Sequence, residues 1–310
     1  MPTPPAPGLP PADDVRRLRP AMRALLLAFS ALTALAVVAL FVLATATDRF
    51  FAWTIQPPLT AALLGAGYAA GCVLVVLSLR DPVWAHSRLA VLTILAFTLL
   101  TLAATVLHLD RFHLQAEFAA LTWLARAAAW FWLGVYVVVP LAMVGALVVQ
   151  ERAPGRDPAP GHPVPVPLRA ALGVESALLL AVGATLWVAP STAASLWPWP
   201  LTPLTARVVA AWLVAFGVAT ALAAVGGDLA RLRTSAIAYA VFGLLVLVSL
   251  ARFPDTVDWS GAPAWVLLGT VLAIVATGAA GWRLAPVPDV DHRADHRADH
   301  RTAHRTGDRR

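Results

Sequence analysis

The tetrapeptide Pro-Leu-Thr-Ala at residues 58–61 opens a long apolar run, and the same tetrapeptide recurs at residues 203–206. The separation of 145 positions also relates Arg88 to Arg233 and Asp110 to Asp255. A fixed offset kept over so much of the chain indicates an internal duplication. Each copy of the tetrapeptide follows a tryptophan-containing cluster and precedes an apolar run, so the duplicated unit is predicted to be a set of membrane-spanning helices.

The tetrapeptide itself suggests a local role. Proline favours the first turn of a helix, and tryptophan favours the headgroup region of a bilayer. We therefore expect each copy to mark the point at which a connector re-enters the membrane. The alternative is a ligand or lipid site built by the neighbouring tryptophans.

The composition excludes an ordinary soluble domain. The chain has 310 residues, of which 59% are hydrophobic and 13% are charged, whereas soluble domains carry about 25% charged residues. The net charge of +6 comes largely from arginines that flank apolar segments. It therefore predicts a membrane orientation with lipids as partners, and it gives no support for a nucleic-acid partner.

Eight apolar runs are long enough to cross a bilayer, whose hydrocarbon core of about 30 Å needs roughly 20 helical residues. They cover residues 22–45, 59–79, 88–107, 127–150, 170–189, 205–226, 234–250 and 262–282. The fourth is the least regular, because residues 119–129 contain Arg126 and are a candidate interfacial segment, and Pro140 is expected to kink the span. The predicted fold class is all-α, an integral membrane bundle of about eight transmembrane helices in two parallel four-helix repeats.

Polar segments divide the chain into domains. Residues 1–21 form a Pro-rich tail and residues 285–310 a tail rich in His, Arg and Asp, both expected to be disordered. Residues 151–167 are too rich in proline for a helix and are predicted to link the first repeat, 22–150, to the second, 168–284. The first run exceeds the about 7 to 15 residues of a signal-peptide core, so we expect a retained span, although residues 44–46 resemble a cleavage site.

The arginines predict the orientation. All 23 basic residues are arginine, and most of them flank the runs on the side of the N-terminus. The exceptions are Arg49, Arg111, Arg126, Arg207 and Arg252. Because basic flanks favour the cytoplasmic side, we expect a multi-pass protein of the cytoplasmic membrane with both termini inside. Parallel repeats would place any pocket or path at the seam between them.

Asp110 and Asp255 each follow the third run of a repeat. Asp110 lies between His108 and His113 in His-Leu-Asp-Arg-Phe-His, and two imidazoles with a carboxylate are ligand types for zinc. The matching segment at residues 253–258 has no histidine, so a metal site would be confined to one repeat. The alternative is that each carboxylate caps its helix or pairs with a neighbouring arginine.

Glu175 is the one acidic residue well inside a predicted span, and its counterpart in the first repeat is Ser30. An acid near the bilayer centre costs roughly 2.5 to 3.5 kcal/mol, so such a group normally faces protein or water and is a functional candidate. Glu175 is therefore a candidate for a proton relay or a substrate contact. The alternative is that its carboxylate reaches back to the cytoplasmic interface.

Arg88 and Arg233 stand at the start of the third and seventh runs. We expect them to anchor these runs on the cytoplasmic side, paired with Asp81 and Asp228. Acidic lipid headgroups are the alternative partners.

Residues 291–310 repeat Asp-His-Arg-Ala with small variations. In a helix, the histidines would form a stripe able to bind a divalent metal, whereas a solvated tail is the simpler expectation. The stripe would comprise His292, His296, His300 and His304. The chain contains no phosphate-binding glycine loop, no His-Glu-x-x-His helix, no Gly-x-Ser-x-Gly elbow and no Cys-x-x-Cys pair. We predict no catalytic residue and no cofactor.

Two segments carry a resemblance. The run at residues 196–207, Leu-Trp-Pro-Trp-Pro-Leu-Thr-Pro-Leu-Thr-Ala-Arg, and the run at residues 108–113 resemble stretches of uncharacterised polytopic membrane proteins of actinobacteria. The similarity covers residues 22–282 and excludes both tails. It implies a membrane location and a source, and it transfers no catalytic or binding residue.

Three functional hypotheses follow. The first is a non-enzymatic membrane protein with a structural, accessory or sensing role, because few polar residues lie at membrane depth. The second is a small-molecule or ion permease with a path between the repeats, gated near Asp110, Asp255 and the tryptophans. The third, a membrane-embedded enzyme, requires that His108, Asp110 and His113 converge.

Overall fold

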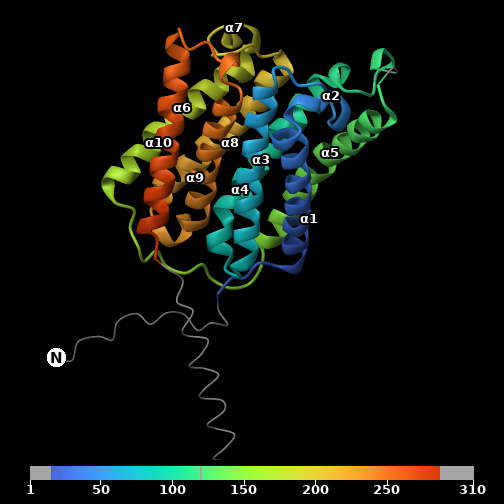
Figure 1. Cartoon of the computed structure of the whole chain (residues 1–310). Helices are drawn as coiled ribbons and strands as arrows, with labels where there is room; N and C mark the ends of the chain where they lie inside the picture. Colours follow the sequence, from blue (N-terminus) through green and yellow to red (C-terminus); the bar gives the residue numbers. More distant parts are fainter. Residues whose placement is uncertain (1–14, 119–120, 287–310) are drawn as a thin grey trace, which may run out of the picture.

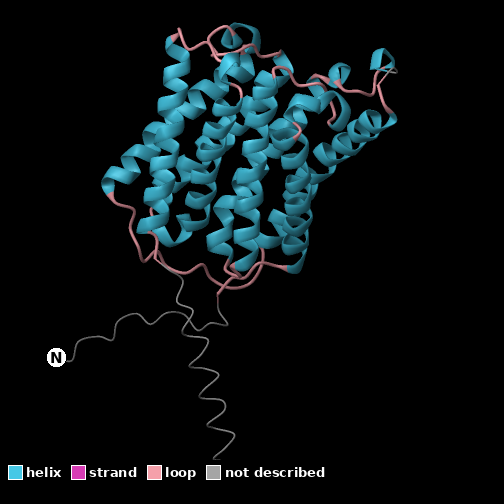
Figure 2. Cartoon of the chain, viewed as in Figure 1, coloured by secondary structure: helices cyan, strands magenta, loops and turns pink. Residues whose placement is uncertain are grey.

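The computed structural model describes residues 15–118 and 121–286. Eight of its helices are long and apolar enough to cross a membrane, which confirms the predicted all-helical membrane bundle. They are α1 (Pro20–Val37, continued by a π-helix at Val38–Val42), α3 (Pro58–Arg80), α4 (Trp84–Leu107), α5 (Trp123–Glu151), α6 (Val166–Val188), α8 (Pro203–Gly226), α9 (Leu229–Arg252) and α10 (Ala262–Leu284) (Figure 1). Short helices α2 (Thr47–Phe50) and α7 (Pro190–Ala194) lie in connectors, and no strand occurs within the described ranges (Figure 2).

Local sequence explains where several helices begin and end. Pro58 and Pro203 are the first residues of α3 and α8, where the missing N–H of proline leaves no helical hydrogen bond unmade. Helix α8 stops at Gly227, whose φ of 61° is the left-handed conformation that glycine adopts most readily. Asp228 then caps α9 by accepting a hydrogen bond from the backbone of Ala230. The repeated tetrapeptide therefore starts a helix in both places.

The fourth span differs from the sequence-based expectation. Helix α5 begins at Trp123, so Arg126 lies inside the helix and residues 123–129 are continuous with the rest of α5. The side chain of Thr122 accepts a hydrogen bond from Ala125 and caps this earlier start. The helix also continues through Pro140 as a single element.

Helices α3, α4, α8 and α9 form the centre of the bundle. Helix α3 packs against α9 and α8 packs against α4, so each half contributes two helices to a shared seam. The outer helices cover this centre, with α1 on α3, α6 on α8, α10 on α9 and α5 on α4 (Figure 1). One hydrophobic core runs through both halves as a result.

The two halves make matching backbone contacts at one end of the bundle. In each half, the segment before the first helix exchanges two hydrogen bonds with the turn before the third helix. The pairs are Leu18 N to Pro82 O and Trp84 N to Arg16 O in the first half, and Val164 N to Gly227 O and Leu229 N to His162 O in the second. Helices α4 and α9, and the 3-10 helices η4 (Leu109–Arg111) and η6 (Pro254–Thr256), also keep the 145-residue offset. Helices α5 and α10 do not, since they start at Trp123 and Ala262.

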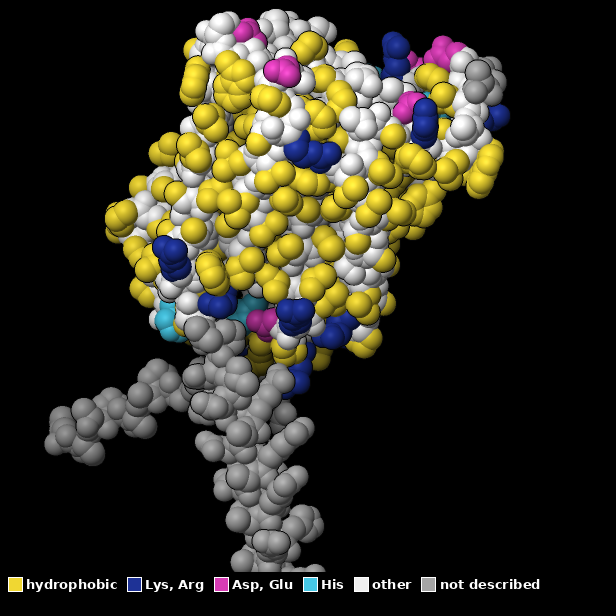
Figure 3. Space-filling model, viewed as in Figure 1, with side chains coloured by type: hydrophobic (Ala, Val, Ile, Leu, Met, Phe, Trp, Pro, Cys, Tyr) yellow, Lys and Arg dark blue, Asp and Glu magenta, His cyan; other side chains and the backbone are white. Residues whose placement is uncertain are grey.

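The end of the bundle that carries these contacts also carries the connector at residues 152–165, so we call it the linker end and the opposite end the far end (Figure 1). Between the two ends, the surface is largely apolar (Figure 3). Val138 and Leu141 of α5, Val174 of α6 and Val266 of α10 are all more than half exposed. Water-soluble proteins seldom expose apolar patches of this extent, so this surface suits lipid.

Candidate functional site

His113 joins two connectors at the far end, its own between α4 and α5 and the one between α2 and α3. Its side chain is fully buried, with Nδ1 3.1 Å from the carbonyl oxygen of Phe51 and Nε2 3.0 Å from Oγ1 of Thr54. Burial lowers the pKa of His113, because a charged imidazole would lose hydration there. A neutral ring donates from Nδ1 to the carbonyl and accepts the threonine hydroxyl at Nε2. Both nitrogens of His113 therefore bind the segment between α2 and α3, and they tie it to the segment between α4 and α5.

His108 joins the two halves instead. Its Nε2 lies 2.7 Å from Nη1 of Arg207, whose Nε donates to the carbonyl of Trp187 at 3.2 Å. Burial and the Arg207 charge lower the pKa of His108. A guanidinium only donates, so the Nε2 lone pair of His108 is directed at Arg207. Among the residues that the structure describes, no three metal-ligating side chains come together.

Asp110 and Asp255 occupy matching places on η4 and η6. The carboxylate of Asp110 is 2.9 Å from Nε of Arg111, and both side chains are largely exposed, so the pair contributes little to stability. Asp255 is exposed and forms no ion pair within residues 15–118 and 121–286. Among the described residues, neither carboxylate forms a hydrogen bond or ion pair with His108 or His113, so the side chains of the predicted cluster bind separate partners.

Glu175 lies near the middle of α6 and is buried. Its carboxylate accepts a hydrogen bond from the Tyr239 hydroxyl of α9 at 3.0 Å and lies 3.0 and 3.1 Å from the Thr277 hydroxyl of α10. It does not reach back to the bundle end, which was the alternative reading of this residue. Tyr239 and Thr277 could not be predicted as its partners, because their helices meet α6 only in the folded bundle.

A cavity lies at the seam, and the empty space among its lining residues, open solvent included, is about 810 Å³. Helices of both halves line it. Leu89, Leu168 and Leu232 line it near the linker end, and Ala70 and Phe97 line it at the middle of α3 and α4. From Leu89 to Phe97 the cavity extends about 12 Å along α4 at the rise of an α-helix. It therefore reaches from the linker end to mid-bundle and stays away from Asp110 and Asp255.

The cavity wall is almost entirely apolar. Four of its hydroxyls already donate within the protein, those of Thr93 and Thr220 to backbone carbonyls and those of Tyr239 and Thr277 toward Glu175. The buried carboxylate thus stands directly behind two wall residues. Such a cavity suits an apolar or amphipathic molecule better than a hydrated ion.

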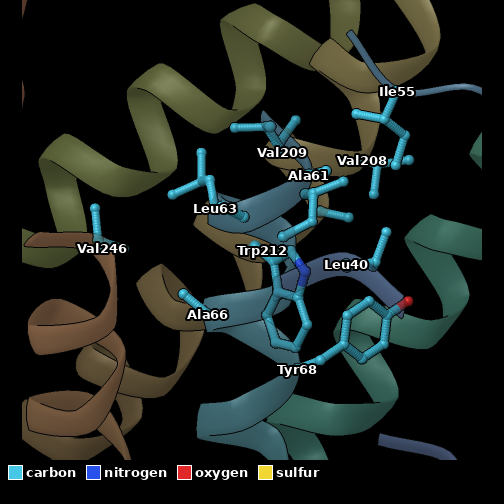
Figure 4. Close-up of a cluster of buried hydrophobic side chains, with 14 of the residues drawn as sticks. Leu40, Ile55, Ala61, Leu63, Ala66, Tyr68, Val208, Val209, Trp212 and Val246 are labelled. Carbon is cyan, nitrogen blue, oxygen red and sulfur yellow. The ribbon is translucent and has the colours of Figure 1, made fainter. Parts of the chain in front are cut away.

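Aromatic rings close the cavity at mid-bundle. The rings of Phe97 and Trp212 are stacked at 3.7 Å between centroids. Tyr68 meets both rings edge-on, and Figure 4 shows it beside Trp212. Gly67 makes room for this arrangement, because a Cβ at that position would lie 2.6 Å from the Trp212 ring. A smaller cavity, with about 320 Å³ of empty space that includes open solvent, lies beyond Phe29 and Phe97, among α1, α3, α4 and α5.

Polar contacts between the halves lie farther toward the far end. The indole N–H of Trp199 donates to the hydroxyl of Thr60 at 2.9 Å, which gives the tetrapeptide a second role besides starting α3. Arg252 of α9 donates to the carbonyl of Phe41, in the π-helix that ends α1, at 2.6 Å. Together with the Arg207 to His108 contact, these bonds hold the two halves together at this end.

The linker end carries a different set of charges. Arg88 binds Glu151 through Nε and Nη2 at 2.9 Å and Asp157 through Nη1 at 2.7 Å. Asp81, the partner expected for Arg88, pairs with His86 at 2.6 Å instead. Burial opposes ionisation of Asp81, but hydrogen bonds from His86 and a backbone amide outweigh it and lower the pKa of Asp81. The actual partners of Arg88 are Glu151, at the end of α5, and Asp157, in the linker, and both are remote from Arg88 in sequence.

The predicted histidine stripe at residues 292–304 lies outside the described residues. The chain matches no protein-family model, and no curated protein and no solved structure proved similar to it.

Proposed function

We propose that this chain is a non-enzymatic protein of the cytoplasmic membrane whose accessory or sensing role depends on an apolar or amphipathic molecule held in the seam cavity. In this proposal the chain is a duplicated pair of parallel four-helix repeats, with both termini and the linker in the cytoplasm. The observation that carries the proposal is the cavity itself. Residues of both halves line it, and almost no polar group enters it.

The contacts around the cavity support a binding role rather than a catalytic one. The far-end residues that could have formed a reactive cluster bind separate parts of the protein. Glu175 is held by two hydroxyls behind the wall. A molecule in the cavity would touch α4, α8 and α9 together, so its presence would alter how the two halves pack.

Native mass spectrometry of the full chain, released from a mild detergent, tests this proposal. We expect one amphipathic molecule to remain bound to each chain. Ala219→Phe, which places a ring in the cavity, should abolish retention. Ala221→Phe on the same helix is the matched control, since Ala221 lies outside the cavity wall. Absence of a retained molecule from the unaltered chain, or equal retention by the Ala219→Phe variant, would refute the proposal.

A small-molecule permease is the second candidate, and one observation favours it. The two cavities lie in series, and Phe29 and Phe97 line both of them. Movement of these rings would join the cavities into a longer path. Transport would also require the far end to open, since Thr60 is completely buried against Trp199 there.

Thiol labelling separates the two candidates. In a Cys72→Ser background, Thr60→Cys should react with an impermeant reagent added outside the cell only if the far end opens. Ser260→Cys, at an exposed far-end position, is the positive control. Labelling of Ser260→Cys without labelling of Thr60→Cys would contradict the permease hypothesis.

A further inference from the structure

Three leucines that line the seam cavity near the linker end each adjoin an arginine. They are Leu89 next to Arg88, Leu168 next to Arg169, and Leu232 next to Arg233. Basic side chains gather at this end of the molecule, over the ends of α4, α9 and α10 (Figure 3). Three arginines are thus next in sequence to wall residues at the linker end of the apolar cavity, and we call these arginines the charged rim.

The three arginines differ in their partners. Arg88 is neutralised by Glu151 and Asp157. Within the described part of the chain, Arg169 and Arg233 form no ion pair. Arg233 donates only to the carbonyl of Ala285, at 3.3 Å. The Arg169 guanidinium lies beside Gly227, where α8 ends.

The depth of the cavity matches a lipid tail. It extends about 12 Å along α4, and one leaflet contributes about half of a hydrocarbon core of roughly 30 Å. A tail that entered at the rim would end against the Phe97 and Trp212 rings. The headgroup of that lipid would then lie at the level of Arg169 and Arg233.

We propose that the seam cavity holds one tail of an anionic phospholipid from the cytoplasmic leaflet, with the phosphate bound by Arg169 and Arg233. Guanidinium groups bind phosphate oxygens through paired N–H donors, which makes arginine well suited to this role. The inference rests on the proposed function and adds the chemical class of the bound molecule. A free phosphate would use the same arginines but would leave the apolar cavity unfilled, so the lipid explains both features.

The test is native mass spectrometry of the full chain, delipidated and then mixed with phosphatidylglycerol or with phosphatidylcholine of the same tails. We expect the unaltered chain to retain phosphatidylglycerol at least several-fold better. The Arg169→Gln/Arg233→Gln double variant should lose this preference. Arg80→Gln/Arg152→Gln is the matched control, because it removes the same charge at exposed linker-end positions outside the cavity wall. That control should keep the preference.

Two further variants make the outcomes distinguishable. Arg169→Lys/Arg233→Lys keeps both charges and should keep most of the preference, which guards against a fold defect in the glutamine variant. Ala219→Phe should lower retention of both lipids. A preference that survives in the glutamine variant would overturn the anionic-lipid inference while leaving the proposed function intact. Unchanged lipid retention in Ala219→Phe would overturn both.

Discussion

Gly67 of α3 and Trp212 of α8 are separated by 145 residues in the sequence and lie against each other where the two helices meet. The positions that the predicted duplication pairs are thus in direct contact, and one is the smallest side chain and the other the largest. The indole of Trp212 fills the space that Gly67 leaves, and it also closes the seam cavity at mid-bundle.

This contact predicts that Gly67→Ala destabilises the protein. The added Cβ would lie 2.6 Å from the buried indole, and overpacking of this kind costs about 1–3 kcal/mol. The midpoint of thermal unfolding in detergent should fall. Gly134→Ala is the control, because no atom beyond the neighbouring residues and the helix's own backbone lies within 4 Å of the new methyl group there. Adding Trp212→Phe to Gly67→Ala should recover part of the loss, and no recovery would argue against the contact as the cause.

Glu175 offers a second prediction. Glu175→Gln should change stability little, because the amide oxygen still accepts from the hydroxyls of Tyr239 and Thr277. Glu175→Ala leaves the buried Tyr239 hydroxyl without its acceptor, which costs about 1–3 kcal/mol. Thermal unfolding of both variants measures the difference. An equal loss in both would show that the negative charge matters more than the hydrogen bonds.

Stability should also depend on pH through the far-end histidines. The pKa values of His108 and His113 are lowered in the folded protein, chiefly by burial, so below about pH 6.5 the unfolded chain binds more protons than the folded one. The contribution of the two neutral histidines to the free energy of unfolding is therefore complete above that pH. It declines as the pH falls toward their lowered pKa values. The unfolding midpoint should drop between pH 7.5 and 5.5. Arg207→Gln should reduce this drop without removing it, because burial of both rings remains.

The Arg88 network predicts how firmly the linker is held. Arg88→Gln removes three hydrogen bonds to Glu151 and Asp157. These groups are partly exposed, so the effect on global stability should be small. Local opening of the linker should instead raise the rate of tryptic cleavage after Arg156. Arg80→Gln, at an exposed position of α3, should leave that rate unchanged, and an equal increase there would count against the network.

The proposed orientation has its own test. In the Cys72→Ser background, an impermeant thiol reagent should label Ser260→Cys in intact cells. Pro160→Cys, in the linker, should be labelled only after the membrane is opened. The reverse pattern would place the linker outside the cell and would invalidate the cytoplasmic assignment of the charged rim.

The helices were predictable because each depends on a local property. Long apolar runs and the prolines at positions 58 and 203 define spans without reference to the rest of the chain. The sequence-based start of the fourth span, at residue 127, is later than the start of α5 at Trp123, because Arg126 is polar for a span and the capping residue is Thr122. The offset between Gly67 and Trp212 was visible in the sequence, but its meaning required knowledge of which helices cross.

The candidate site was less predictable, since it depends on contacts between distant segments. Glu175 is a candidate from sequence because an acidic side chain is energetically costly inside a span. Its partners Tyr239 and Thr277, however, lie on helices that sequence spacing does not connect to α6. His108 and His113 are close in sequence but bind different parts of the fold. The cavity has no sequence signature, because its walls consist of the same apolar residues as any span.

Because Gly67 and Trp212 differ so much in size, each half packs well only against the other half. Two copies of the first half, assembled in the same way, would bring glycine opposite glycine and leave a void where the indole now packs. Two copies of the second half would force two indoles into the space of one. Under the predicted duplication, a single-half ancestor that assembled as a homodimer would have lost that option when these two positions diverged.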